Sequence, residues 1–189
     1  MTFANTLTAS RLVTVALMLL SAWQHERGWF AWLLGYALVT DLVDGSIARA
    51  LGQATPFGAR LDSIADAAVY LTAPVAALYL YPRLREREWM TIVVILLAYV
   101  VPIAVGYVKY KRLTAYHTFA ARAAGVLLGI AALLFVTLGI TWPVRVGAAV
   151  LVLSAIEEIA LTAVLPDWRP NVRTIAHALR IRSVPTLTP

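Results

Sequence analysis

Six long apolar blocks constrain the fold of this chain more than any other feature. A helix needs about 20 predominantly apolar residues to cross the hydrocarbon core of a bilayer. The blocks cover residues 11–24, 29–47, 63–82, 89–108, 121–140 and 143–165. The first becomes long enough only if residues 5–10 join its helix. The pattern predicts an all-α integral membrane protein with six transmembrane helices.

Composition supports a membrane protein and narrows its chemistry. Hydrophobic residues make up 61% of the chain and charged residues 14%, whereas soluble domains have about 45–50% and 25%. The chain contains no cysteine, which excludes disulfides and thiolate-ligated zinc. The net charge of +6 favours anionic partners. With so much apolar sequence we expect these to be membrane lipids and not nucleic acid.

The basic residues predict how the helices are oriented. With the N-terminus in the cytoplasm, eleven Lys and Arg residues lie inside and five outside, as the positive-inside rule prefers. The first block has no small-residue cleavage site, so we expect it to stay as a helix. Both termini are then cytoplasmic. We expect one transmembrane domain over residues 1–170 and a basic cytoplasmic tail over residues 171–189.

Four of the ten acidic residues lie in one segment, DLVDGSIARALGQATPFGARLDSIAD. They are Asp41, Asp44, Asp62 and Asp66. On helices, the first two share one face at i and i+3, and the last two share another at i and i+4. A break containing Gly52, Pro56 and Gly58 separates the two helices. We therefore expect both acidic faces to converge at the cytoplasmic end of the bundle.

Four carboxylates at this depth would repel each other and resist desolvation, and a divalent cation relieves both problems. Hard oxygen ligands favour Mg²⁺, Mn²⁺ or Ca²⁺. Gly45 allows a ligand to approach the backbone, and Arg49 suits a phosphate. Together these residues indicate a metal-bridged pyrophosphate and phosphoryl transfer. The alternative is structural: the aspartates pair with Arg49 and Arg60, or simply face the cytoplasm at helix ends.

The same residues resemble a known family signature. The motif D-x-x-D-G-x-x-A-R-x8-G-x3-D-x3-D of the class I CDP-alcohol phosphotransferases matches at every fixed position between Asp41 and Asp66. The opening ANTLTASR is similar to the N-x-L-T-x-x-R of the same family. The resemblance covers the six blocks and the whole chain apart from the tail. It implies a bacterial inner-membrane enzyme that is a homodimer.

The resemblance also implies roles for individual residues. Asp41, Asp44, Asp62 and Asp66 would hold a two-metal centre of Mg²⁺ or Mn²⁺, with Asp66 also the catalytic base. The nucleotide pocket would be lined by Asn5, Thr8, Gly45, Arg49, Thr55 and Gly58. The implied reaction transfers a phosphatidyl group from CDP-diacylglycerol to the hydroxyl of a small polar alcohol and releases CMP.

The acceptor alcohol is less constrained. A basic cluster in KYKRLTAYHTFAAR, residues 109–122, contains Arg112, His117 and Arg122 and could bind an acceptor phosphate. Glycerol 3-phosphate is the first choice of acceptor, with inositol phosphate or another alcohol as alternatives. The cluster could equally set topology and anchor lipid headgroups. In the last block Glu157 could bind acceptor hydroxyls or pair with Arg122, and its neighbour Glu158 points about 100° away.

Two other functions compete with the transferase. A divalent-cation transporter would also need carboxylates, but these belong near the bilayer midplane, often at broken helices. Here they cluster at one end beside an arginine, which would repel the ion. A catalytically inactive scaffold is the other possibility, and the intact motif argues against it.

Overall fold

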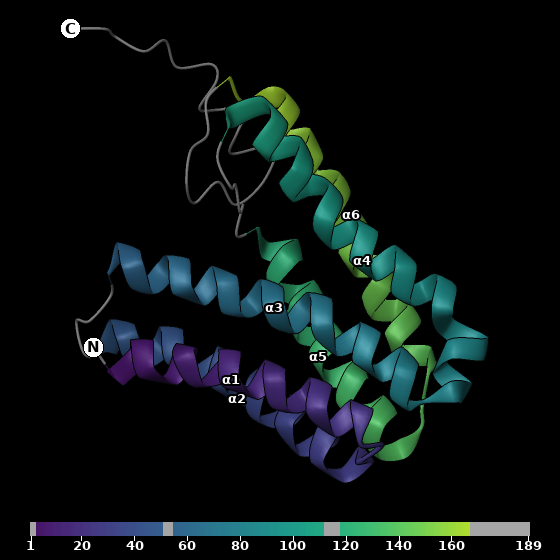
Figure 1. Cartoon of the computed structure of the whole chain (residues 1–189). Helices are drawn as coiled ribbons and strands as arrows, with labels where there is room; N and C mark the ends of the chain where they lie inside the picture. The colour runs from purple at the N-terminus through teal and green to yellow at the C-terminus, as the bar shows by residue number, and fades with distance from the viewer. Residues whose placement is uncertain (1–2, 51–54, 112–117, 167–189) are drawn as a thin grey trace, which may run out of the picture. The chain divides into compact units, whose positions relative to one another are not determined.

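The structure is a computed structural model that describes residues 3–50, 55–111 and 118–166, without the side chains of residues 3–5, 44–50, 56 and 59. Six α-helices make up the described chain (Figure 1). They are α1 (Phe3–Trp23), α2 (Arg27–Ala50), α3 (Pro56–Leu80), α4 (Pro82–Tyr110), α5 (Phe119–Leu138) and α6 (Trp142–Val164). The predicted all-α class is confirmed. The basic tail lies outside the described residues.

Five helices in the described part of the chain are long and apolar enough to cross a membrane. Within the described residues these spans are Thr6–Trp23, Arg60–Leu80, Pro82–Tyr110, Phe119–Leu138 and Trp142–Val164. The chain is therefore a multi-pass membrane protein. The side chains of α2 are described only as far as residue 43, so α2 is not among the five. A sixth span through α2 stays a prediction.

Two helices begin earlier in the chain than the apolar blocks that predict them. The helix α1 begins at Phe3, so residues 5–10 do join it and give it the length to span. The helix α3 begins at Pro56, seven residues before the predicted block. Thr55 caps it, since the Thr55 hydroxyl accepts a hydrogen bond from the Gly58 amide at 3.0 Å. Gly58 is therefore in the first turn of α3, and its placement in the break was wrong.

The chain divides into two compact units, each described here by itself. The first comprises Met1–Trp89 and Leu133–Gly139, and the second comprises Met90–Ala132 and Ile140–Pro189. In the first unit α1 packs along both α2 and α3, whereas α2 and α3 touch each other much less. Met18 on α1, Phe30 on α2 and Ala65 on α3 are fully buried. The helix α1 is thus the element that fixes α2 relative to α3.

In the second unit, the end of α4 caps the end of α6. The Lys109 ammonium donates hydrogen bonds to the carbonyls of Thr162 at 2.6 Å and Leu165 at 2.8 Å. The Tyr110 hydroxyl donates to the same two carbonyls. A cation at this position satisfies orphan carbonyls and complements the negative end of the helix dipole. Lys109 is therefore committed to the structure of this unit.

Candidate functional site

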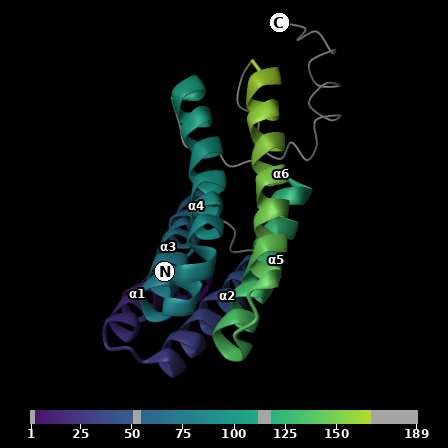
Figure 2. The same ribbon diagram turned by 90° about the vertical axis from the view of Figure 1, so that its right-hand side faces the viewer.

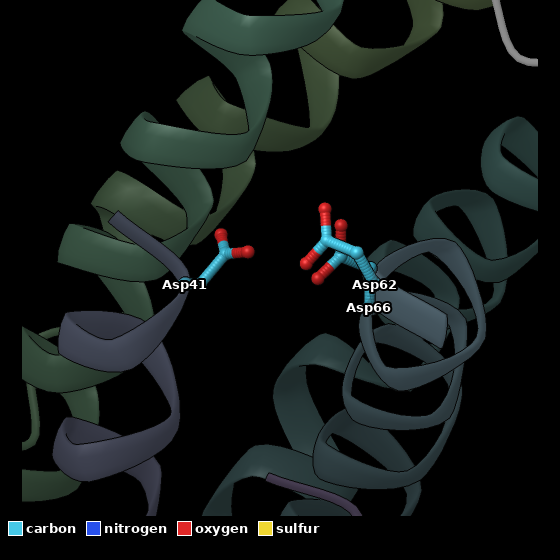
Figure 3. Close-up of side chains that lie close together, drawn as sticks. All are labelled: Asp41, Asp62 and Asp66. Atoms are coloured by element: carbon cyan, nitrogen blue, oxygen red, sulfur yellow. The ribbon is translucent and has the colours of Figure 1, made fainter. Parts of the chain in front are cut away.

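Three of the four motif aspartates converge in the first unit. Asp41 on α2 faces Asp62 and Asp66 on α3 (Figure 3). One carboxylate oxygen from each residue lies within 4.8 Å of the other two. The predicted convergence of the two acidic faces is confirmed for these three residues. The side chain of Asp44 lies outside the described residues.

Helix register explains why the three carboxylates meet. Asp62 and Asp66 are one turn apart on α3, and Ala65 between them is fully buried against the neighbouring helices. On α2, Thr40 directly before Asp41 is buried, and its hydroxyl donates to the carbonyls of Tyr36 and Ala37 at 2.8 and 3.0 Å. Ala65 is small, and the Thr40 hydroxyl is hydrogen-bonded within its own helix, so both helices can approach α1 closely. The acidic edges of α2 and α3 therefore turn toward the same point.

The centre also contains a residue that the sequence did not assign to it. The Nη1 atom of Arg11, on α1, donates to Asp41 Oδ1 at 2.9 Å and to Asp62 Oδ1 at 3.4 Å, and it also contacts Asp66 Oδ1. The Arg11 side chain is 1% exposed, whereas those of the aspartates are 36%, 41% and 29% exposed. The cation thus approaches from the buried side and leaves the carboxylates open on the other.

A sequence signal for Arg11 was available. A charged residue inside an apolar span is costly unless it has a partner in the bundle, and Arg11 is the only Lys or Arg in residues 1–26. The sequence predicts for it only a place among the eleven basic residues inside and the last position of the opening motif ANTLTASR. The structural alternative for the aspartates is therefore partly realised: they do form an ion pair, but with Arg11. The Arg60 side chain is exposed, and no ion pair to it is seen in the described part of the chain.

The donor set fits a hard divalent cation. Such cations bind carboxylate oxygens at about 2.0–2.6 Å, so two oxygens on opposite sides of one cation are about 4–5 Å apart. The three carboxylate oxygens lie within 4.8 Å of one another, and can therefore share one cation. A carboxylate also accepts from several partners at once, so contact with Arg11 does not exhaust its capacity.

The structure describes the side chains of only some of the residues predicted to bind the nucleotide. The side chains of Asn5, Gly45 and Arg49 lie outside the described set. Thr8 is buried on α1, one turn before Arg11. Thr55 and Gly58 are used together in the cap of α3, which gives both a structural role.

The residues predicted to bind the acceptor belong to the second unit, where they are described in part. Arg112 and His117 lie outside the described residues. Arg122 is exposed in the first turn of α5, and Glu157 is half-buried on α6. Among the described residues, no ion pair joins Arg122 to Glu157. Lys109, in the same cluster, is taken by the cap of α6.

The fold and the centre together define a helical membrane protein with an acidic site where α1, α2 and α3 meet, and its carboxylates could hold a metal ion. Comparison with known families identifies it further. The family model of the CDP-alcohol phosphatidyltransferases matches residues 1–165, and the chain belongs to this family.

Individual relatives match a shorter segment. The chain is 36% identical over 78 residues to a candidate cardiolipin synthase found in Mycobacterium bovis and in Mycobacterium tuberculosis. It is 30% identical over 79 residues to a CDP-diacylglycerol–serine O-phosphatidyltransferase of Helicobacter pylori. These matches cover 40% and 42% of this chain, but only 36% and 33% of the relatives. No solved structure matches the chain significantly.

Proposed function

We propose that this chain transfers a phosphatidyl group from CDP-diacylglycerol to the hydroxyl of a small polar alcohol and releases CMP. The observation that carries the proposal is the convergence of Asp41, Asp62 and Asp66 from two helices, at the motif positions of the matched family. Carboxylates are expensive within apolar helices, and intramembrane ionisable residues are functional by default.

The reaction is a displacement at phosphorus. The acceptor hydroxyl oxygen forms a bond to the phosphorus that carries diacylglycerol, and the bond from this phosphorus to the CMP oxygen breaks. The proton of the hydroxyl passes to the Asp66 carboxylate, and CMP leaves with the electron pair. Asp41, Asp44 and Asp62 would hold Mg²⁺ or Mn²⁺, with Asp66 completing the centre. Bound cations would neutralise the pyrophosphate and the developing charge.

The position of the site suits a substrate that is part lipid and part nucleotide. Asp62 lies in the second turn of α3, which begins at Pro56, and Asp66 one turn further along. A site near the end of a span lets the diacylglycerol stay among the lipids while the CDP group meets the carboxylates. From the distribution of basic residues, this end faces the cytoplasm.

An acceptor screen tests the proposal directly. The purified full chain, supplied with CDP-diacylglycerol and Mg²⁺ or Mn²⁺, should release CMP only when a suitable alcohol is present. Candidates are glycerol 3-phosphate, inositol, inositol phosphate, serine and a second phospholipid. Serine is included because it stands in the name of the Helicobacter pylori relative. No CMP release with any of them would count against the proposal, and Mn²⁺ uptake into proteoliposomes would favour a cation transporter instead.

Glycerol 3-phosphate remains our first choice of acceptor. The argument is the basic segment 109–122, whose described members beyond the cap are Lys111 and Arg122, both exposed. An exposed cation is available to a phosphate, whereas Lys109 is not. Family resemblance also supports a homodimer, which we include in the proposal.

Replacing Arg122 by Ala is expected to raise the KM for a phosphorylated acceptor by about tenfold or more, since a hydrogen bond to a charged group contributes roughly 1.5–3 kcal/mol. The KM for CDP-diacylglycerol should stay the same. Arg85→Ala is the matched control, because Arg85 is also exposed and lies at the opposite predicted face of the membrane. Equal KM values for the acceptor in both variants would assign Arg122 to topology or lipid binding.

A further inference from the structure

The position of the Arg11 guanidinium coincides with the place a bridging cation would take. A single nitrogen, Nη1, contacts the Oδ1 atoms of all three carboxylates. A divalent cation that bridges the same oxygens must lie about 2.0–2.6 Å from each, close to the same point. Arg11 and a cation therefore cannot both hold this position. They are alternative counter-ions for these atoms.

Arg11 is also the link between the two helices that carry the carboxylates. It extends from α1, which packs along both α2 and α3, while those two helices touch each other much less. Figure 1 shows α1 running beside α2, and Figure 2 shows the same helices in a view turned by 90°. With its side chain 1% exposed, the guanidinium cannot turn to bulk water for compensation. Without a counter-ion, the three carboxylates would repel one another across the α2–α3 gap.

We propose that Arg11 is a built-in counter-ion of the Asp41–Asp62–Asp66 triad, and that a divalent cation competes with it for the shared carboxylate oxygens. The proposal rests on the metal centre of the proposed function and adds a positioning residue to it. Three ionised carboxylates and one guanidinium carry a net charge of −2, which one divalent cation balances. Arg11 would thus hold the ligands together before metal binds and weaken binding of the metal once it arrives.

The test compares Arg11→Met with the unchanged chain in nanodiscs of phosphatidylcholine, a lipid with no net charge. Unfolding is followed by tryptophan fluorescence in EDTA and in saturating Mn²⁺, and Mn²⁺ affinity is measured by the electron paramagnetic resonance of the free ion. In EDTA, Arg11→Met should unfold several degrees lower, and Mn²⁺ should close most of this difference because it replaces the missing charge. Mn²⁺ should bind Arg11→Met about tenfold more tightly, since a like charge has been removed from its site.

Two further variants control for charge and for folding. Arg60→Met removes the same charge from an exposed position of α3, and should change Mn²⁺ affinity by less than about threefold because solvent screens it. The double variant Arg11→Met with Asp66→Asn removes one repelling carboxylate, and should recover part of the lost thermal stability in EDTA. If Arg11→Met does not fold, the double variant supplies the comparison of Mn²⁺ affinity with Asp66→Asn alone.

Two results would overturn the inference: a stability difference that is equal in EDTA and in Mn²⁺, or Mn²⁺ binding that Arg11→Met leaves unchanged or weakens. Either would show Arg11 to be an ordinary packing or anchoring residue. The expected Mn²⁺ pattern without CMP release from any acceptor would leave this inference standing and remove the proposed function. CMP release without the expected effect of Arg11→Met on Mn²⁺ binding and stability would remove this inference and leave the proposed function standing.

Discussion

Chelation of divalent cations by EDTA is expected to abolish CMP release, lowering turnover by about 10³-fold or more, since a catalytic metal contributes several kcal/mol of charge stabilisation. The reason is the donor set. Three carboxylate oxygens within 4.8 Å of one another could hold a hard cation. Arg11 supplies only one of the positive charges that a pyrophosphate and three carboxylates require. Mg²⁺ or Mn²⁺ added in excess should restore activity.

The control for this experiment is EDTA saturated beforehand with Mg²⁺, which removes any direct effect of the chelator on the membrane. Thermal unfolding should be followed in parallel, because loss of metal also leaves the carboxylates to Arg11 alone. Inactivation without unfolding would show that the metal is needed for the reaction and not for the stability of the fold. Undiminished turnover in metal-free buffer would contradict a metal-dependent mechanism.

The fold could be predicted largely from hydropathy, because the lipid environment imposes an apolar length on every spanning helix. The helix boundaries were harder to predict from hydropathy. Hydropathy does not register a cap, so the start of α3 at Pro56 was missed, although Thr55 followed by proline is a recognisable N-terminal signal. The helix α2 forms as predicted and extends three residues beyond the predicted block 29–47, to Ala50.

The acidic centre could be predicted from the spacing of the motif, because i, i+4 spacing on one helix fixes which side chains share a face. The contact of Arg11 with these carboxylates could not be predicted from the spacing. Arg11 is 30 residues from Asp41 and 55 from Asp66, and only the packing of α1 against both helices brings it there. The basic segment near residue 109 shows a related limit. Charge alone did not distinguish Lys109, which caps α6, from Arg122, which is exposed.

The substitutions Asp66→Asn and Asp41→Asn should separate the chemical step from metal binding. We expect Asp66→Asn to keep most binding of CDP-diacylglycerol and to lose turnover by about 10²–10⁴-fold, the usual cost of a lost general base. The predicted apolar block 63–82 would place Asp66 in the first turn of its helix. Asp66 lies well inside α3, which begins at Pro56. It therefore stands on a rigid helix turn, half-buried beside Asp62, where an oxygen can face both a cation and an incoming hydroxyl.

Asp41→Asn should act differently, because Asp41 is the described ligand contributed by α2 to a centre whose other described ligands come from α3. Removing its charge should lower Mn²⁺ affinity by at least about tenfold, since even partners beyond the metal ligands are worth 10–100-fold. Excess Mn²⁺ should then recover part of the turnover of Asp41→Asn and none of the turnover of Asp66→Asn.

The measurement is nucleotide binding and CMP release for both variants across one metal titration. Asp62→Asn serves as the comparison, because Asp62 shares the helix of Asp66 but has no proposed role as a base. Rescue of Asp66→Asn by metal, with no rescue of Asp41→Asn, would reverse the two roles and move the proton acceptor from α3 to α2.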